Sequence, residues 1–182
     1  MQTKMSGKTI LSLDPSSTAC GWALLDLAGR ILEGGIIKPS KVRAEPQFRI
    51  KSMAEDFEQL LNEFRPGIVF IEITSGKVGT NRHKGAGAGL ATYGMAVGFL
   101  WCVAANWLRQ LPAEQQGQTE VVVVKENDWT RGVPKADRIA AVAAEFSQYN
   151  PIEDPGGDLA DAIALGQWHI KEYKVKLAEC VQ

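Results

Sequence analysis

Four acidic residues stand where carboxylates can do chemistry. Glu72 lies within the apolar run at residues 69–73, where an ionised side chain is costly unless a cation or hydrogen-bond donors meet it. Asp14 directly follows another apolar run. Asp158 and Asp161 are three positions apart, so they would project from one face of a helix. Carboxylates from separate segments suit hard divalent ions with oxygen ligands, so the pattern predicts a Mg²⁺ site.

Such a site requires the strands that carry Asp14 and Glu72 to be neighbours. Adjacent strands lie about 4.8 Å apart, and paired metal ions for phosphoryl chemistry lie ~3.5–4 Å apart. Each acid could instead have a purely structural role. Asp158 could be a helix N-cap, with Asp161 placed to oppose the helix dipole. Asp14 could be an ordinary turn residue before Pro15, and Glu72 could belong to a buried ion pair.

Hydrophobic periodicity and turn residues indicate the elements that would position these side chains. Short apolar runs predict strands at residues 9–13, 20–27, 31–38, 68–73 and 121–124. Apolar spacing predicts an amphipathic helix at 53–64, and further helices are expected at 90–111, 135–149 and 158–174. Three hairpin-linked strands followed by strands separated by helices predict an α/β fold, a mixed five-stranded sheet flanked by helices.

Length and composition limit the class of protein. The 182 residues correspond to one domain, spanning 1–182, and 45% apolar with 23% charged residues is typical of a soluble globular protein. The formal charge of −1 excludes a uniformly basic nucleic-acid binder but allows one basic face. The three cysteines lack zinc-site spacing and the N-terminus lacks an apolar leader, so we expect a cytoplasmic location.

Residues 85–108 carry no charge, and by length alone they could span a bilayer. Polar and glycine residues at 92–94 and Gly98 interrupt the apolar stretch, which favours a helix buried in an α/β core, and no membrane association is predicted. The glycines would allow another helix to pack closely. Trp101 and Trp107 are predicted to lie in the internal core rather than at a dimer face.

Three segments resemble the motifs of the RuvC-type Holliday junction resolvases, a family within the RNase H-like nucleases. Residues 10–23, ILSLDPSSTACGWA, look like the opening motif. Residues 68–72 resemble the second motif, a hydrophobic strand that carries Glu, and residues 157–164 look like the closing helix with its D-x-x-D-A-x-A pattern. The segments occur in the family's order, and the similarity runs from about Lys8 to Ile170.

The resemblance implies an RNase H-like fold in which Asp14, Glu72, Asp158 and Asp161 form the catalytic, metal-binding tetrad. It implies two Mg²⁺ ions per active site, with Mn²⁺ as a substitute, and hydrolysis of phosphodiester bonds without a protein nucleophile. The family cuts four-way DNA junctions as homodimers through paired symmetric nicks. The expected activity is therefore that of a crossover junction endodeoxyribonuclease, and the expected partners are branched DNA and a second copy of the chain.

Because the net charge is near zero, DNA would have to be bound by local groups of basic residues. One group lies on the glycine-rich segment after Glu72 and another precedes the last two helices, whereas the basic segment 38–51 fits a solvated loop equally well. His169 is predicted to be structural. The predicted DNA-binding residues are Lys77, Arg82, Lys84, Lys125, Arg131 and Lys135.

The sequence departs from the family's pattern at two places. Ser16 stands where many relatives carry Gly, and no aromatic residue follows Glu72, where many bacterial members have one implicated in opening the junction centre. A phage-type nuclease with broader branched-DNA or flap specificity is therefore an alternative. A noncatalytic branched-DNA binding module with the same fold is another. An actin-like phosphotransferase is excluded because that architecture needs two such domains.

Overall fold

The structure is a computed structural model that describes residues 9–39, 45–74 and 86–179. Three strands come first, and helices then separate and follow the two remaining strands. In chain order they are β1 (Thr9–Pro15), β2 (Cys20–Asp26), β3 (Ile31–Ile37), α1 (Pro46–Phe64), β4 (Ile68–Ile73), α2 (Ala86–Gln110), α3 (Ala113–Gln116), β5 (Glu120–Lys125), α4 (Glu126–Thr130), α5 (Lys135–Glu145) and α6 (Asp158–Glu179).

The strands form one five-stranded sheet in the order β3-β2-β1-β4-β5. β1 to β3 pair antiparallel, whereas β4 and β5 continue the sheet in parallel with β1. This confirms the predicted α/β fold, a mixed five-stranded sheet flanked by helices. The chain's first strand is therefore the central strand, and it borders both an antiparallel and a parallel neighbour.

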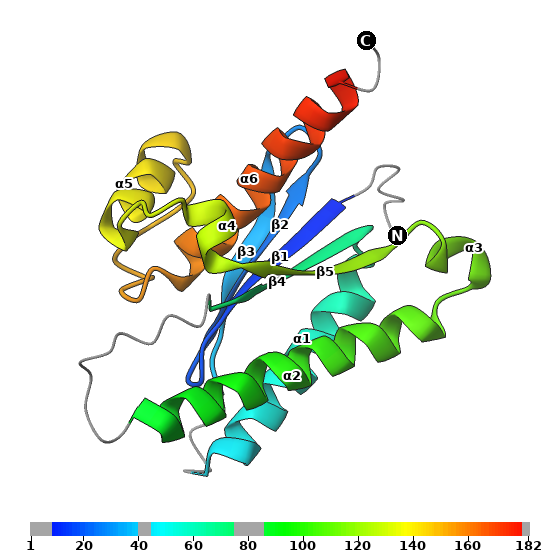
Figure 1. Ribbon diagram of the computed structural model, residues 1–182, viewed down its shortest axis with the longest axis vertical. Helices are drawn as coiled ribbons and strands as arrows, with labels where there is room; N and C mark the ends of the chain where they lie inside the picture. The colour runs from blue at the N-terminus through cyan, green and yellow to red at the C-terminus, as the bar shows by residue number, and fades with distance from the viewer. Residues whose placement is uncertain (1–8, 40–44, 75–85, 180–182) are drawn as a thin grey trace.

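Helices cover both faces of the sheet, with α1 and α2 on one face and α4, α5 and α6 on the other (Figure 1). Alternation along β1 separates two cores because successive side chains point to opposite faces. Leu11 and Leu13 belong to the core with α1 and α2, whereas Ile10 belongs to the core with α6. Ser12 also faces α6, where its hydroxyl donates to the carbonyl of Ala162 at 2.6 Å.

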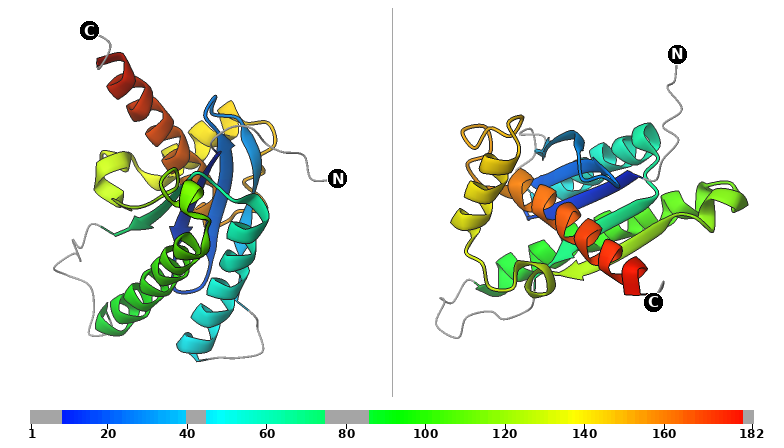
Figure 2. Two further views of the ribbon diagram at one scale, coloured as in Figure 1. Left: turned by 90° about the vertical axis from the view of Figure 1, so that its right-hand side faces the viewer. Right: turned by 90° about the horizontal axis from the view of Figure 1, so that it is seen from above.

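The long helix α2 is not the buried helix that the sequence predicted. It lies beside α1 (Figure 2) and buries one stripe of side chains, including Trp107, which is 4% exposed. On its outer face Trp101 is 46% exposed, and a Cβ added to Gly94 or Gly98 would meet nothing within 4 Å. The placement of Trp101 in the core was therefore wrong. The segment Gly89–Gln110 is also long and apolar enough to cross a membrane by length and composition, and 17% of its most apolar window is buried.

Several element boundaries differ from the predictions because turn and capping residues decide them. α1 begins at Pro46, which suits the first turn of a helix because proline lacks the N–H that would be unpaired there. α5 ends at Glu145, since Phe146 takes an extended conformation. The short helices α3 and α4 were not predicted, because four or five residues give no hydrophobic period.

Candidate functional site

Strand pairing places Asp14 and Glu72 next to each other. β1 and β4 run parallel, and the last paired residues are Leu13 and Ile71, so the next position on each strand carries a carboxylate. Both side chains alternate onto the sheet face that α6 covers. Glu72 is 8% exposed, because the core under α6 surrounds it. The strand arrangement required for a shared metal site is present.

The first turn of α6 brings Asp158 and Asp161 to the same face. Asp161 is buried, and Asp158 is the first residue of the helix rather than its N-cap. The capping side chain is the buried Asp154, which accepts the backbone N–H groups of Asp158 at 2.9 Å and Ala160 at 3.0 Å. Tyr149 donates its hydroxyl to the same carboxylate at 2.9 Å. The capping role considered for Asp158 thus belongs to Asp154, which leaves the Asp158 carboxylate available to the site.

A glycine on β2 lets the start of α6 approach the sheet closely. Gly21 pairs with Asp14 in the β1/β2 ladder. A Cβ added to Gly21 would lie 2.0 Å from the carbonyl oxygen of Asp158, a distance no side chain can occupy. Backbone contact between β2 and α6 therefore sets the separation of Asp14 from Asp158.

The ammonium group of Lys135, at the start of α5, lies among three of the carboxylates. Its Nζ is 3.1 Å from Asp161 Oδ2, 3.2 Å from Asp158 Oδ1 and 3.8 Å from Asp14 Oδ2. Burial alone would lower the pKa of Lys135, but the surrounding carboxylates raise it above its ordinary value. A protonated amine thus lies where the oxygens of β1 and α6 converge.

A second cation, Arg138, is held more tightly than Lys135. Its Nε and Nη2 donate to the two oxygens of Asp161 at 2.7 and 2.9 Å, and its Nη1 donates to the carbonyl of Val133 at 2.7 Å. The side chain of Arg138 is 11% exposed, against 40% for Lys135. A bidentate guanidinium–carboxylate pair of this kind fixes geometry as well as charge. Arg138 is therefore a built-in counter-ion of Asp161.

Trp129, on α4, holds the remaining carboxylate. Its indole Nε1–H donates to Glu72 Oε2 at 2.7 Å, and both side chains are buried. The guanidinium of Arg138 lies over the Trp129 ring, 5.1 Å from its centroid. Glu72 and Asp161 are thus linked through one tryptophan and one arginine.

The carboxylates repel one another and are partly desolvated. Burial raises the pKa of Asp14 well above its ordinary value, and Glu72, Asp161 and Asp158 raise it further, whereas Lys135 lowers it. Burial also raises the pKa of Glu72 to about 7, against the opposing effect of the Trp129 hydrogen bond. Mutual repulsion of this kind indicates a site that a further cation would stabilise.

The donor set fits a hard divalent ion. It consists of oxygen atoms, and four carboxylates against two fixed cations leave an acidic excess. As they stand, no three His, Cys, Asp or Glu side chains within the described ranges are grouped closely enough to hold a metal. The ammonium of Lys135 lies among the oxygens of Asp14, Asp158 and Asp161 as a cation of the chain's own.

The predicted DNA-binding residues have different outcomes. Lys77, Arg82 and Lys84 lie outside the described residues. Of the remaining three residues, two are paired with acids. Lys125 is exposed at the end of β5, Arg131 pairs with Glu172 at 2.8 Å, and Lys135 lies among the carboxylates.

Sequence reasoning missed the residues that support the carboxylates. Trp129 is far from Glu72 in the sequence, and Asp154 sits in a turn-rich loop. Neither residue matched a motif. Gly21 lies within the opening motif, but no role was predicted for it. His169, predicted to be structural, packs on Phe70 with ring centroids 4.1 Å apart.

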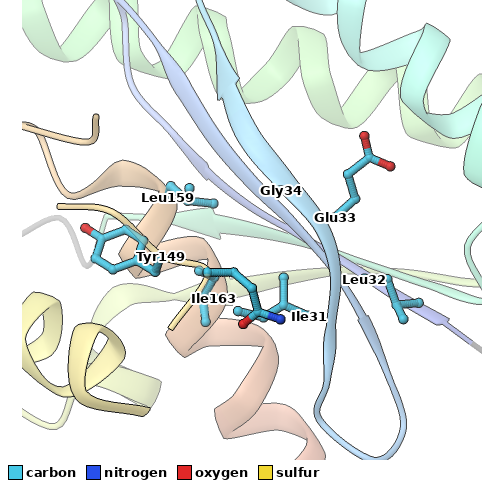
Figure 3. Close-up of a pocket in the computed structure, with 8 residues that line it drawn as sticks. Ile31, Leu32, Glu33, Gly34, Tyr149, Leu159 and Ile163 are labelled. Carbon is cyan, nitrogen blue, oxygen red and sulfur yellow. The ribbon is translucent and has the colours of Figure 1, made fainter. Parts of the chain in front are cut away.

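A small cavity lies on the same sheet face, away from the carboxylates. It measures about 180 Å³ and lies between β3, the loop before α6 and α6 itself (Figure 3). Ile31, Leu159 and Ile163 give it an apolar lining, and Tyr149, which supports Asp154, borders it.

Comparison with known proteins gives a likeness of structure. No family model matches the sequence, and no curated protein matches it. RuvC of T. thermophilus in complex with a Holliday junction substrate superposes with a TM-score of 0.66 at 17% identity, over 93% of this chain and 96% of that chain.

Two further solved structures also superpose on this chain. Another structure of Thermus thermophilus RuvC gives a TM-score of 0.60 at 17% identity, over 92% of this chain and 96% of that one. The yeast mitochondrial Holliday junction resolvase gives 0.55 at 13% identity, over 94% and 84%. At such identities the likeness shows the fold, since one fold can host unrelated activities. The resemblance seen in the sequence motifs is thus confirmed in three dimensions: the chain has the fold of the RuvC-type Holliday junction resolvases.

Proposed function

We propose that this protein is a Mg²⁺-dependent endonuclease that resolves four-way DNA junctions by paired symmetric nicks. One observation carries the proposal: carboxylates from the central strand, its parallel neighbour and the last helix meet on one face of a RuvC-like fold. Asp14, Glu72, Asp158 and Asp161 are the proposed catalytic and metal-binding residues. A structural carboxylate cluster would need no such acidic excess.

Different residues of this chain would bind the metal ions, orient a carboxylate and contact the DNA. The carboxylates would hold Mg²⁺, or Mn²⁺ as a substitute, and two such ions would supply activation of water and neutralisation of the charge that develops on a phosphodiester. Arg138 holds Asp161 in one orientation through hydrogen bonds to both of its carboxylate oxygens. Lys135, which is more exposed, can leave the carboxylates and contact a phosphate of the DNA.

DNA would be bound through its backbone around this site. Lys125 ends β5 and pairs with Ile73, the residue after Glu72, which supports a phosphate contact there. Arg131, which directly follows α4 and pairs with Glu172, remains a predicted contact. Lys77, Arg82 and Lys84 remain predicted contacts on the basis of sequence. Because the net charge is −1, affinity must come from these local contacts and should fall steeply with salt.

The outer face of α2 supports a homodimer. It is apolar where Met95, Phe99 and Trp101 are exposed, and Gly94 and Gly98 leave room for the backbone of a partner helix. A two-fold pairing buries the same face of each copy. It would also supply the second active site that paired nicks on a symmetric junction require. We therefore propose a second copy of the chain, rather than lipid, as the occupant of this face.

The test is cleavage of matched four-way, three-way, flap and linear DNA with Mg²⁺ and with chelator. We expect the wild type to nick the four-way junction symmetrically and Asp14→Asn to lose cleavage by more than about 1,000-fold, because a site that binds metal through carboxylates depends on each of them. Asp137→Asn, an exposed acid on α5, is the matched control and should cleave normally. Cleavage by Asp14→Asn at the wild-type rate would refute the site.

Two other activities would give distinct results in the same assay. Equal cleavage of flap, three-way and four-way DNA would indicate the broader phage-type nuclease, consistent with the lack of an aromatic residue after Glu72. Tight junction binding with no cleavage at any Mg²⁺ concentration would indicate the noncatalytic binding module. A single nuclease domain spanning 1–182 and a cytoplasmic location remain predictions.

A further inference from the structure

We propose that Trp129 is a positioning residue that orients Glu72 for metal binding through its indole N–H. The inference rests on the proposed nuclease function and adds to it a residue outside the carboxylate tetrad. It derives from one hydrogen bond between α4 and β4 and from the way the tryptophan itself is fixed.

The hydrogen bond leaves a defined part of Glu72 available. Indole has one N–H and no acceptor, so Trp129 can engage only one carboxylate oxygen, and at 2.7 Å that oxygen is Oε2. Oε1 is left for a cation. Because both side chains are buried, water competes little with the indole N–H for the Glu72 oxygen.

Glu72 depends on an orienting hydrogen bond more than the other three carboxylates do. Its side chain has one more rotatable bond than aspartate, and it leaves a strand whose neighbours Phe70 and Val124 are apolar. Asp161, by comparison, is gripped at both oxygens by Arg138. Without a hydrogen-bond donor, the Glu72 carboxylate could rotate and turn Oε1 away from the site. The N–H of Trp129 fixes the rotation of this carboxylate.

Trp129 is itself held in place from the active-site side. Arg138 lies over its ring at 5.1 Å while binding Asp161. Contacts therefore run from Glu72 through Trp129 and Arg138 to Asp161, and they connect β4 with α6 by way of α4 and α5. Such partners of metal ligands usually set ligand orientation and affinity.

The chain offers a matched control in Trp168 on α6. Its indole nitrogen is buried and, within the described part of the chain, has no hydrogen-bond partner. Trp168→Phe therefore removes the same atoms as Trp129→Phe without removing a hydrogen bond. Any difference between the two variants reports the N–H contact with Glu72.

The experiment measures Mg²⁺ binding to the full chain by calorimetry, without DNA, for the wild type and both variants. We expect Trp129→Phe to weaken Mg²⁺ binding by about 10- to 100-fold, the usual effect of removing a partner of a metal ligand. Trp168→Phe should stay within about twofold of the wild type. Equal affinity in Trp129→Phe and the wild type would overturn the inference and leave the nuclease proposal standing. Absence of Mg²⁺ binding by the wild type would overturn both.

A second measurement follows the tryptophan in the wild type and uses the variant Glu72→Gln only to assign its signal. In ¹H–¹⁵N spectra of the wild type, the chain gives five tryptophan indole signals. The signal displaced by Glu72→Gln belongs to Trp129, and Mg²⁺ should shift this signal while leaving that of Trp168 in place. If Mg²⁺ binds but the Trp129 signal does not move, Trp129 has no part in orienting Glu72.

Discussion

The two faces of the sheet carry long helices that are held in different ways. On one face α6 is locked to the strands by polar and backbone contacts: the Ser12 hydroxyl reaches the carbonyl of Ala162, and Gly21 admits the backbone of Asp158. On the other face α2 packs by one apolar stripe and leaves a second apolar stripe uncovered. The proposed metal site would need fixed backbone distances, whereas the proposed surface for a second copy of the chain would need only shape and apolarity.

The largest effect should come from a methyl group added on the α6 face. In Gly21→Ala the new Cβ would lie 2.0 Å from the carbonyl oxygen of Asp158, so α6 or β2 must shift. We expect the free energy of unfolding to fall by about 3 kcal/mol or more, with loss of cleavage, measured by urea unfolding and junction nicking.

The matched change on α2 is Gly98→Ala, where the Cβ would meet nothing within 4 Å. It should leave the isolated fold as stable or up to about 1 kcal/mol more stable, because alanine favours a helix over glycine. Similar losses in both variants would mean that the two helices are held alike, contrary to the comparison.

The next effect is a pH dependence confined to the α6 face. The pKa of Glu72 is raised from 4.5 to about 7 in the folded protein, so between these values the folded chain holds a proton that the unfolded chain has released. Stability of the metal-free protein should therefore fall as pH rises through this window, by at most roughly 3 kcal/mol. Urea unfolding in chelator at pH 5 and 8 measures this change.

Glu72→Gln should reduce that dependence, because the amide does not titrate, and Asp14, whose pKa burial also raises, would account for what remains. In the wild type, Mg²⁺ should restore stability at pH 8, since a cation offsets the ionised carboxylates. A slope unchanged by Glu72→Gln would assign the pH dependence to other groups.

A smaller effect is expected at the cap of α6. Asp154→Ala removes the acceptor of the Asp158 and Ala160 amides and should cost about 1–2 kcal/mol of stability. Cleavage should fall as well, because the first turn carries two of the carboxylates. Glu153→Ala, next in sequence and exposed, should change stability by less than about 0.5 kcal/mol. Thermal unfolding of both variants measures this difference, and equal stability of the two would mean that the Asp154 cap contributes nothing.

The smallest change in stability should come from the outer face of α2. Phe99→Glu replaces a side chain that is 44% exposed, so it should change the stability of the isolated fold by about 0.5 kcal/mol or less. It should nevertheless convert dimers to monomers in sedimentation velocity and separate the paired nicks into single ones. A dimer that persists in Phe99→Glu would place the interface elsewhere.

The sequence predicted the strands, their mixed pairing and the acids on them well, because alternation and turn residues are local signals. The predicted burial of α2 in the core was wrong, because apolar composition shows that a helix has apolar side chains to cover but not which partner covers them. The sequence also carried no sign that Lys135 lies beside Asp161 or that Arg131 pairs with Glu172, and the DNA contacts predicted for these two residues remain predictions. Contacts such as that of Trp129 with Glu72, 57 residues apart, leave no pattern along the chain.

The central position of β1 has a consequence for the folding of the protein. Its partner across the site is the last helix, and the Ser12 contact with Ala162 spans 150 residues. Contacts of such sequence separation form late, after the loops between them close. The carboxylates of Asp158 and Asp161 therefore join those of Asp14 and Glu72 only after α6 has packed on the sheet, so the proposed metal site assembles late in folding.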